Sequence, residues 1–249
     1  MDRLTRVAVA VVALSLFASV SPSLDATFGR GETLDYDLEW LSMTGGRARM
    51  TIQPQAADAS NYRITSVART SSAFSRIYKV RDEIETVVAR SNFTTIRYHK
   101  SLNEGSSRKD ETTTYANGIA TRKGKTYAVP TPVFDPLSLV YYLRTLDLAP
   151  GRTFNFTVFA DKKTYDVAAH VTKRQTIDTP AGKFAAIVVE PDMDAGGLYR
   201  DDQSKLTIWY SDDERRIPLR IRSDVKIGAI TMTLRRVTDS VTSITPDSK

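Results

Sequence analysis

Most of the chain alternates apolar and polar residues with a period of two. In residues 34–40, Leu, Tyr, Leu and Trp alternate with Asp, Asp and Glu, and similar runs occur at residues 48–52, 165–172 and 219–227. This period is typical of half-buried β-strands. Turn signals separate the runs, at Gly45-Gly46, Asn117-Gly118, Lys123-Gly124, Pro150-Gly151, Pro180-Ala181-Gly182 and Gly196-Gly197. The pattern predicts a mainly β, antiparallel domain, with a hairpin turn at Gly45-Gly46.

Residues 135–146 break this period. Asp135 is a suitable N-cap, Pro136 fits the first helical position, and apolar residues then cover nearly every helical face as far as Leu146. A helix that is apolar on all sides must be buried on all sides. We therefore predict a single strongly curved sheet, an open barrel or β-spiral, wrapped around this one buried helix. A second, shorter helical turn is predicted in residues 72–77.

The N-terminal residues 1–26 have the features of a secretory signal peptide. Arg3 and Arg6 precede an apolar run at residues 7–20, and small residues follow up to Ala26. The run is shorter than the roughly 20 residues that span a bilayer. We therefore predict a cleaved signal, a periplasmic protein and no transmembrane span after cleavage. The predicted domain covers residues 27–237, and residues 238–249 form a flexible tail.

Composition narrows the chemistry available to the protein. The 249 residues include no Cys, which excludes disulfides, thiolate metal sites and cysteine nucleophiles, and His99 and His170 carry the only imidazoles. The net charge of +6 is spread over separate basic pairs, a pattern typical of a solvated outer face rather than a nucleic-acid site. This positive charge also allows weak attraction to anionic envelope polymers or lipid headgroups.

Candidate catalytic and metal-binding motifs do not meet their geometric requirements. Ser223 and Lys226 point to opposite faces of a strand, and the tetrad at residues 106–109 lies in a polar stretch that we interpret as a solvated loop. Residues 192–197 resemble the start of a calcium loop but lack its later ligands. The carboxylates at residues 201–202 and 212–214 are adjacent, and Asp212-Asp213 is predicted to shape a hairpin. We predict no catalytic, cofactor-binding or metal-binding residue, and no enzymatic activity.

Four segments in order resemble a known family: residues 28–36, residues 135–138 with 148–151, residues 179–184, and residues 209–213 with 216–220. They are similar to the bacterial exported family known as domain of unknown function 3108. The resemblance implies an envelope protein without an agreed activity, built like the open or spiral β-barrels of lipoprotein carriers and envelope-integrity proteins. It supplies no catalytic residues, and fold alone does not fix function.

Three functional hypotheses remain open at this stage. The preferred one is a non-catalytic periplasmic protein with a structural or interaction role in envelope integrity, whose partner is an envelope protein, a lipid or an anionic polymer. The second is a carrier or sensor of a lipid or lipoprotein acyl chain, although a helix that fills the hollow leaves little room for it. The third is a hydrolase of envelope glycan. Possible ligand contacts on the concave face are Tyr141, Tyr142, Phe154 and Phe156.

Overall fold

The computed structural model describes residues 27–40, 43–76, 78–192, 205–225 and 228–239. The predicted signal peptide, most of the calcium-like segment at 192–197, the carboxylates at 201–202, Lys226 and residues 240–249 lie outside this range. The last strand ends at Asp239, two residues beyond the predicted end of the domain.

A 14-stranded antiparallel sheet forms the protein, as predicted from the alternating sequence. Its strands are β1 (Glu32–Trp40), β2 (Met43–Gln55), β3 (Asp58–Thr70), β4 (Arg81–Ala89), β5 (Thr95–Glu104), β6 (Ser107–Ala116), β7 (Ile119–Arg122), β8 (Lys125–Ala128), β9 (Thr153–Ala160), β10 (Lys163–Thr179), β11 (Gly182–Pro191), β12 (Lys205–Ser211), β13 (Pro218–Val225) and β14 (Gly228–Asp239).

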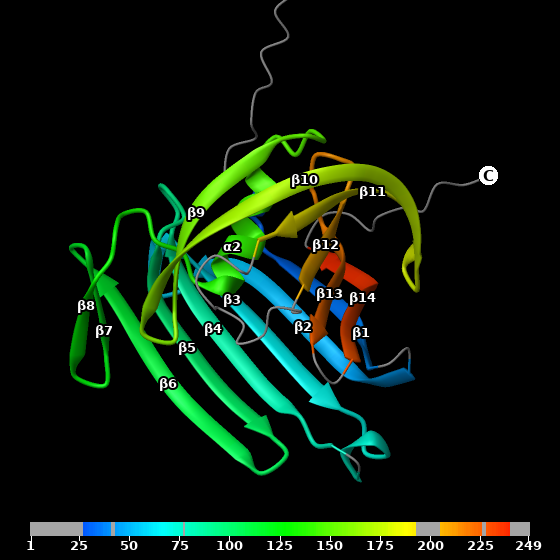
Figure 1. The fold of residues 1–249 in the computed structure, drawn as a ribbon, viewed down its shortest axis with the longest axis horizontal. Helices are drawn as coiled ribbons and strands as arrows, with labels where there is room; N and C mark the ends of the chain where they lie inside the picture. Colours follow the sequence, from blue (N-terminus) through cyan, green and yellow to red (C-terminus); the bar gives the residue numbers. More distant parts are fainter. Residues whose placement is uncertain (1–26, 41–42, 77, 193–204, 226–227, 240–249) are drawn as a thin grey trace, which may run out of the picture.

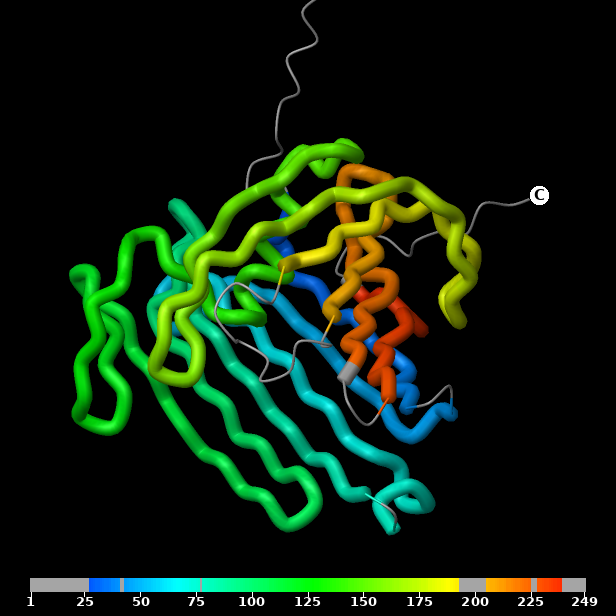
Figure 2. Tube along the Cα trace, viewed as in Figure 1, coloured from blue at the N-terminus to red at the C-terminus, as the bar shows by residue number. Residues whose placement is uncertain are grey.

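The sheet order is β8-β7-β6-β5-β4-β3-β2-β1-β14-β13-β12-β11-β10-β9. Strands that follow one another in the chain therefore lie side by side in the sheet, with one exception: β8 and β9 do not pair but form the two edges. The first and last strands, β1 and β14, pair with each other in the middle of the sheet. Figure 2 shows the blue and red strands of this central pair side by side. The sheet curves into an open barrel, and β10 arches over the helix (Figure 1).

The helix connects the two edge strands. It consists of α2 (Pro136–Tyr142) followed by a 3-10 turn, η2 (Leu143–Thr145), so the predicted helix tightens in its last turn. Asp135 is the N-cap, and with Ser138 it forms a capping box that satisfies the first backbone N–H groups. α2 packs against β3, β4 and β9 inside the curved sheet (Figure 1), which confirms the predicted buried helix. The shorter predicted turn is the 3-10 helix η1 (Phe74–Arg76).

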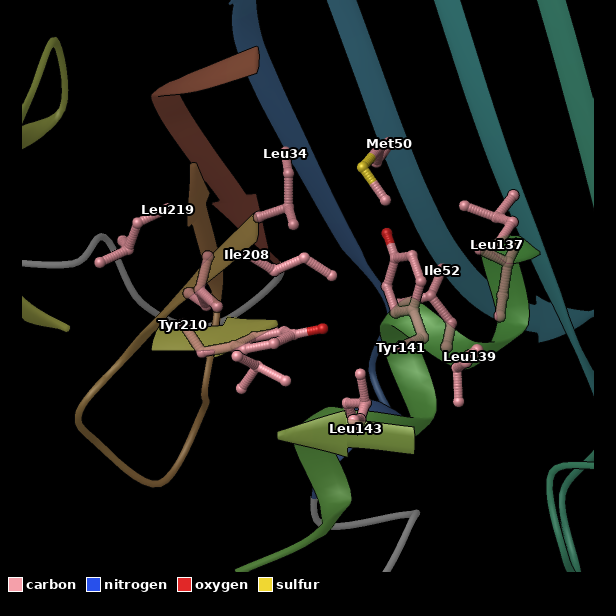
Figure 3. Close-up of a cluster of buried hydrophobic side chains, with 14 of the residues drawn as sticks. Leu34, Met50, Ile52, Leu137, Leu139, Tyr141, Leu143, Ile208, Tyr210 and Leu219 are labelled. Carbon is pink, nitrogen blue, oxygen red and sulfur yellow. The ribbon is translucent and has the colours of Figure 1, made fainter. Parts of the chain in front are cut away.

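Apolar side chains from both halves of the sheet meet the helix in one main core. Figure 3 shows this convergence around Tyr141 and Tyr210. The labelled members come from six elements: Leu34 on β1, Met50 and Ile52 on β2, Leu137 and Leu139 on α2, Leu143 on η2, Ile208 on β12 and Leu219 on β13. A smaller core cluster containing Tyr98, Tyr115 and Phe159 lies between β5, β6 and β9. No helix in the described ranges has the length and apolarity to cross a bilayer.

The predicted hairpin turn at Gly45-Gly46 is wrong, because both glycines lie inside β2. The register shifts there: Leu38 of β1 faces Gly46 and Glu39 faces Thr44, so Gly45 is the extra residue of a β-bulge. A Cβ on Gly46 would lie 2.3 Å from the carbonyl oxygen of Arg69. The glycines therefore allow a bulge and a close backbone approach, two roles that share the sequence signature of a turn.

The segment before the helix bridges part of the gap between the sheet edges. Phe134 donates its N–H to the Thr157 carbonyl on β9 and accepts from the N–H of Phe159, while the Val133 carbonyl accepts from the N–H of Thr95 on β5. The segment thus connects the edge strand β9 to β5 in the other half of the sheet, two strands that do not pair directly in the described residues.

Ion pairs between charged side chains stabilise the same region. Asp161, in the turn between β9 and β10, lies 2.6 Å from the Lys100 Nζ on β5 and 3.2 Å from the Lys109 Nζ on β6. Partial burial alone would raise the pKa of Asp161, but the two ammonium groups outweigh burial and lower the pKa to about 2. The same burial lowers the pKa of Lys100. Protonation of the Asp161 carboxylate is therefore the step that makes this contact sensitive to acid.

We expect the Asp161 contact to make stability pH-dependent in acid. The pKa of Asp161 in the folded protein lies below the usual aspartate value of 3.8, so the stabilising effect of the contact is complete above about pH 4 and disappears as the pH falls towards 2. Urea unfolding of the wild type and of Asp161→Asn should show a stability difference that is constant at neutral pH and shrinks below pH 4. A difference that does not change with pH would show that the carboxylate charge is not its source.

Candidate functional site

A groove lined by arginines lies on the face of the sheet that points away from the helix. Leu34 and Tyr36 of β1 point into the core, so the alternate residue Asp35 points outward. The groove has a volume of about 890 Å³, and we call it the arginine groove. Its walls include Val67 and five arginines, which are Arg47 and Arg49 from β2, Arg69 from β3, and Arg235 and Arg236 from β14.

Two aspartates of β1 hold four of these arginines in place. Asp35 accepts from Arg49 Nε at 2.7 Å and from Arg236 Nη2 at 2.7 Å. Asp37 lies 2.8 Å from Arg47 Nη1 and 3.7 Å from Arg235 Nη1. Partial burial alone would raise the pKa of Asp35, but the hydrogen bonds from Arg49 and Arg236 outweigh it and lower the pKa. The Asp35 carboxylate therefore stays ionised, and both aspartates orient the guanidinium groups that they contact.

Positive charge nevertheless exceeds negative charge in the groove. Five arginines against two aspartates leave a formal surplus of three positive charges. Arg47 and Arg69 are directly opposite each other in the β2–β3 register, an arrangement of like charges that destabilises a sheet. The side chains that contact the aspartates are still 52–66% exposed, so many of their N–H donors face solvent. The groove can therefore take an anion.

The tip of the β10–β11 hairpin provides another wall of the arginine groove. Pro180 at this tip lines the groove, and the neighbouring Ala181 N–H donates to the Leu234 carbonyl of β14. Arg220 of β13 donates to the Asp178 carbonyl at 2.8 Å. These bonds fix the hairpin tip beside β14, so that the otherwise open sheet face becomes a groove.

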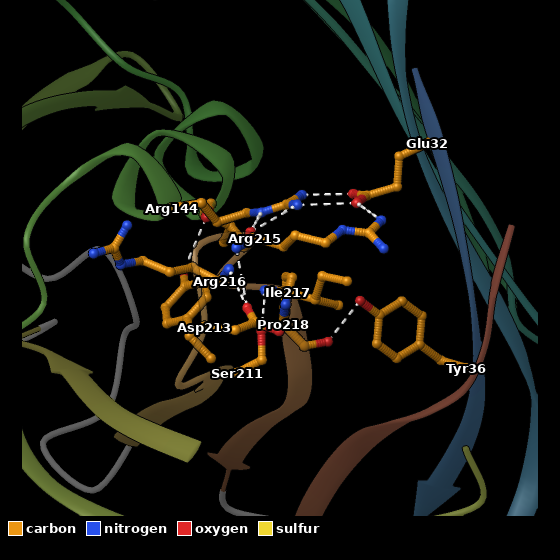
Figure 4. Close-up of polar contacts among 11 residues, drawn as sticks. Glu32, Tyr36, Arg144, Ser211, Asp213, Arg215, Arg216, Ile217 and Pro218 are labelled. Carbon is orange, nitrogen blue, oxygen red and sulfur yellow. Dashed lines mark hydrogen bonds and ion pairs between the residues drawn. The ribbon is translucent and has the colours of Figure 1, made fainter. Parts of the chain in front are cut away.

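A second groove, of about 420 Å³, lies beside the β12–β13 turn and mixes acidic with basic side chains. Asp213 Oδ1 accepts from Ser211 Oγ and from the backbone N–H groups of Arg215 and Arg216 (Figure 4). Asp212 pairs with Arg174 Nε at 2.8 Å. Asp213 therefore shapes the turn between β12 and β13, which confirms the prediction that this acidic pair forms a hairpin.

An ion pair is buried between β1, η2 and the β12–β13 turn. The side chain of Arg144 is 0% exposed, and its two terminal nitrogens bind both oxygens of Glu32 at 2.6 and 3.0 Å (Figure 4). Its Nε and Nη2 also donate to the Arg215 carbonyl, and its guanidinium lies 4.9 Å from the ring centre of Phe28. Burial alone would lower the pKa of Arg144, but Glu32 raises it. Both charged groups of the ion pair are therefore part of the packed core.

The four residues predicted as concave-face ligand contacts are all buried in the main core or packed against it. Tyr141 is fully buried, with its ring centre 6.0 Å from that of Phe28, and burial raises the pKa of its hydroxyl. Tyr142 and Phe156 pack against each other at 6.0 Å, and both contact Phe134. Phe154 is half-buried against the main core. Both grooves described above are lined by other residues, and a ligand role for these four side chains stays a prediction.

The two histidines lie on strands. His99 on β5 is half-buried, 3.3 Å from Asp110, and the exposed His170 on β10 contacts Thr153 Oγ1 at 3.0 Å. The tetrad at residues 106–109 lies in the β5–β6 hairpin rather than in a loop, because Ser107 and Lys109 belong to β6 and pair with β5.

The arginine groove was not predicted from the sequence, because the basic residues were interpreted as a solvated outer face. A signal was present in β1 and β2, where Asp35 and Asp37 alternate in step with Arg47 and Arg49. The contribution of Arg235 and Arg236 carried no local signal, because β14 joins β1 from the far end of the chain.

Comparison with solved structures shows a shared barrel-like fold. A beta-barrel-like protein of domain of unknown function DUF1849 from Brucella abortus is 12% identical with a TM-score of 0.58, and the match covers 85% of this chain and 98% of that chain. Lower-scoring similarities, both with a TM-score of 0.36, are to a "putative exported protein with YmcC-like fold" from Bacteroides fragilis (9% identity, 83% and 95% coverage) and a "putative lipoprotein" from Parabacteroides distasonis (12% identity, 84% and 95% coverage).

The sequence matches no curated protein. The model of one family, described as protein of unknown function (DUF3108), matches residues 35–235, which extend from β1 to β14 and include four of the five arginines of the groove; Arg236 directly follows the matched range. The strand order, the buried helix and this match agree with the resemblance found in the four sequence segments. The chain belongs to the DUF3108 family.

Proposed function

We propose that the protein is a non-catalytic, exported protein of the cell envelope that binds an anionic ligand in the arginine groove. The observation that carries this proposal is the convergence of five arginines from β2, β3 and β14, with a surplus of three positive charges over two aspartates. The signal-like residues 1–26 support export to the periplasm.

The arrangement of the groove favours binding because its donors are already oriented. Asp35 and Asp37 fix the guanidinium groups of Arg49, Arg236 and Arg47 on paired strands, so a ligand need not order flexible side chains. Guanidinium groups recognise phosphate and carboxylate oxygens with paired hydrogen bonds. The opposed Arg47 and Arg69 would be relieved of mutual repulsion by an oxyanion between them.

Three carboxyl groups that are held by structural hydrogen bonds and an ion pair support a binding role over catalysis. Asp135 accepts hydrogen bonds from the helix N-terminus, and Glu32 is paired with Arg144. Asp213 is bound to the backbone of its own turn. Hydrogen bonds of this kind hold a carboxyl group in one position, whereas a general acid or base needs access to a substrate proton.

The test is calorimetric titration of the protein with polyphosphate and, separately, with polygalacturonate. We expect Arg47→Gln combined with Arg69→Gln to weaken binding at least about tenfold, because two charge-assisted contacts are lost. Binding should also weaken as salt rises. Arg47 and Arg69 are chosen because they face each other across β2 and β3, and because Asp37 keeps Arg235 as a partner when Arg47 is replaced, whereas Arg49 and Arg236 together hold Asp35.

The matched control combines Arg152→Gln with Arg222→Gln, which removes the same charge from exposed arginines paired with Asp147 and Asp224. This control should bind nearly as well as the wild type. An equal loss in both variants would show a general effect of net charge, and failure of the wild type to bind either polymer would contradict an anion site in the groove.

A further inference from the structure

Three arginines form a row on the outer face of the sheet, one on each of three neighbouring strands. Arg47 of β2 is directly opposite Arg69 of β3, and Arg69 is directly opposite Arg81 of β4. Directly opposite residues of antiparallel strands point to the same face, so all three side chains lie on the face that carries the arginine groove. The three strands lie side by side (Figure 1). We call Arg47, Arg69 and Arg81 the arginine row.

The arginine row continues the basic surface of the arginine groove beyond the groove itself. Arg47 and Arg69 line the groove, whereas Arg81 lies outside it. Neighbouring strands are about 4.8 Å apart, so the four strand spacings between Arg236 on β14 and Arg81 on β4 amount to about 19 Å. The hairpin tip with Pro180 stands beside β14, at the other side of the groove. The basic surface therefore extends away from the hairpin, across β3 and β4.

Two members of the arginine row have no acidic partner in the part of the chain that the structure describes. Asp37 lies 2.8 Å from Arg47, but no carboxylate lies within ion-pair distance of Arg69 or Arg81, and both side chains are exposed. Glu83, two residues after Arg81 on β4, is opposite Val67 rather than an arginine. Like charges directly opposite each other destabilise a sheet. The row therefore costs stability that no acidic neighbour of Arg69 and Arg81 offsets.

The spacing of the row suits a chain of anionic groups. The row presents one guanidinium per strand, about 4.8 Å from the next. A single oxyanion between Arg47 and Arg69 relieves the repulsion of one opposed pair, whereas successive anionic groups on one chain relieve both pairs. Once the first group is bound, the next contacts form within the same complex, so each adds affinity without a new loss of translational freedom.

We propose that the ligand of the arginine groove is a linear polyanion that lies across the strands and leaves the groove over the arginine row. This inference rests on the proposed function and deepens it, because it gives the length and the direction of the ligand. Anionic groups of the chain bind between Arg236 and Arg47 in the groove, and the following groups bind Arg69 and Arg81. Each repeat unit carries a phosphate or a carboxylate, since guanidinium groups bind both with paired hydrogen bonds.

The test compares digalacturonate, which is too short to reach from the groove to Arg81, with decagalacturonate, which is longer than the row. In calorimetric titrations, Arg81→Gln should weaken the binding of decagalacturonate about fivefold, the loss expected for one charge-assisted contact at an exposed site. The same variant should leave the weaker binding of digalacturonate unchanged. Arg81 is exposed, so the variant should fold, and its thermal unfolding checks this. Parallel titrations with tripolyphosphate and long-chain polyphosphate distinguish a phosphate polymer from a carboxylate polymer.

The matched control is Arg222→Gln on β13. It removes the same charge from an exposed arginine outside the row, which is paired with Asp224. This control should bind both galacturonates as the wild type does. Arg81→Lys keeps the charge and should retain most of the affinity for decagalacturonate.

A second readout follows the direction of the bound chain. The sequence contains no Cys, so a single introduced cysteine takes a fluorescent label at a chosen position. Ser101 of β5 is opposite Glu83, one strand beyond Arg81 on the proposed path, whereas Thr238 follows Arg236 by two residues along β14. We expect decagalacturonate to change the emission of the label more at Ser101→Cys than at Thr238→Cys. An equal or larger change at Thr238→Cys would overturn the proposal, because the chain would then run along the strands.

Failure of this proposal can be distinguished from failure of the proposed function. The proposal alone is overturned if the wild type binds decagalacturonate and Arg81→Gln binds it equally tightly, or if Arg222→Gln loses as much affinity as Arg81→Gln. In both cases the groove still binds anions, and the Arg47→Gln, Arg69→Gln variant still loses that binding. The proposed function itself fails if the wild type binds neither the short nor the long anions of either chemistry.

Discussion

Replacing Arg144 with methionine is expected to lower the free energy of unfolding by about 3–5 kcal/mol. The substitution leaves the Glu32 carboxylate, 5% exposed, without the guanidinium that binds both of its oxygens. It also leaves the Arg215 carbonyl without the donors it receives from Arg144. An unpaired buried charge costs far more than the lost attraction alone, because it has been removed from water. Urea unfolding followed by far-ultraviolet circular dichroism measures the change.

The control for Arg144 replaces both partners. Arg144→Met combined with Glu32→Leu removes the charges together, and we expect it to recover more than half of the loss, since apolar side chains of similar size can replace a buried ion pair. Arg215 also contacts Glu32, at 3.2 Å, but it is partly exposed and can turn to solvent. If Arg144→Met alone changed stability by less than about 1 kcal/mol, the ion pair would not be buried as described.

The Arg144 ion pair joins parts of the chain that are distant in sequence. Glu32 lies at the start of β1, Arg144 in the turn that ends the helix, and the accepting Arg215 carbonyl between β12 and β13. Tyr36 adds a similar link by donating to the Pro218 carbonyl at 2.9 Å. The helix is thus attached to the central strand pair through specific polar contacts as well as through apolar packing.

Local patterns predicted most of the fold. The alternation of Leu34, Tyr36 and their polar neighbours identified β1, and the all-round apolar character of residues 137–143 placed the helix inside the sheet. Both inferences succeed because side-chain period and burial are local consequences of backbone geometry. The Gly45-Gly46 prediction failed because a β-bulge and a turn use glycine for the same reason, close approach of the backbone.

The candidate site was harder to predict, since its residues meet only through long-range pairing. Arg236 reaches Asp35 across 201 positions of sequence, and nothing local indicates that β14 lies beside β1. Arg144 did carry a signal. A single arginine within an apolar helix requires a buried acid, because a buried guanidinium must be paired, although the sequence does not identify Glu32 as that acid.

Replacing Asp135 with alanine is the second change for which we expect a large effect, a loss of about 2–4 kcal/mol in the free energy of unfolding. Asp135 is fully buried, and each of its oxygens has two donors. Oδ1 accepts from the N–H groups of Leu137 and Ser138 at 2.9 and 3.0 Å, and Oδ2 accepts from the hydroxyls of Thr86 and Thr95 at 2.6 and 2.9 Å. Alanine would leave the N–H groups of Leu137 and Ser138 without this acceptor in the core. The hydroxyls of Thr86 and Thr95 would keep only their other contacts, to the Arg97 carbonyl and to Ser138 Oγ.

Asp135→Asn separates the charge from the hydrogen bonds. Burial raises the pKa of Asp135, and the hydrogen bonds from Thr86, Ser138 and Thr95 only partly oppose this effect. A raised folded pKa means that the ionised form costs stability at neutral pH and that this cost falls as the pH drops through the folded pKa. The amide keeps an acceptor for the helix N-terminus without the charge, so we expect Asp135→Asn to lose less than half as much stability as Asp135→Ala. Equal losses in guanidinium unfolding at pH 7 would contradict this account, because the carboxylate charge itself would then stabilise the helix.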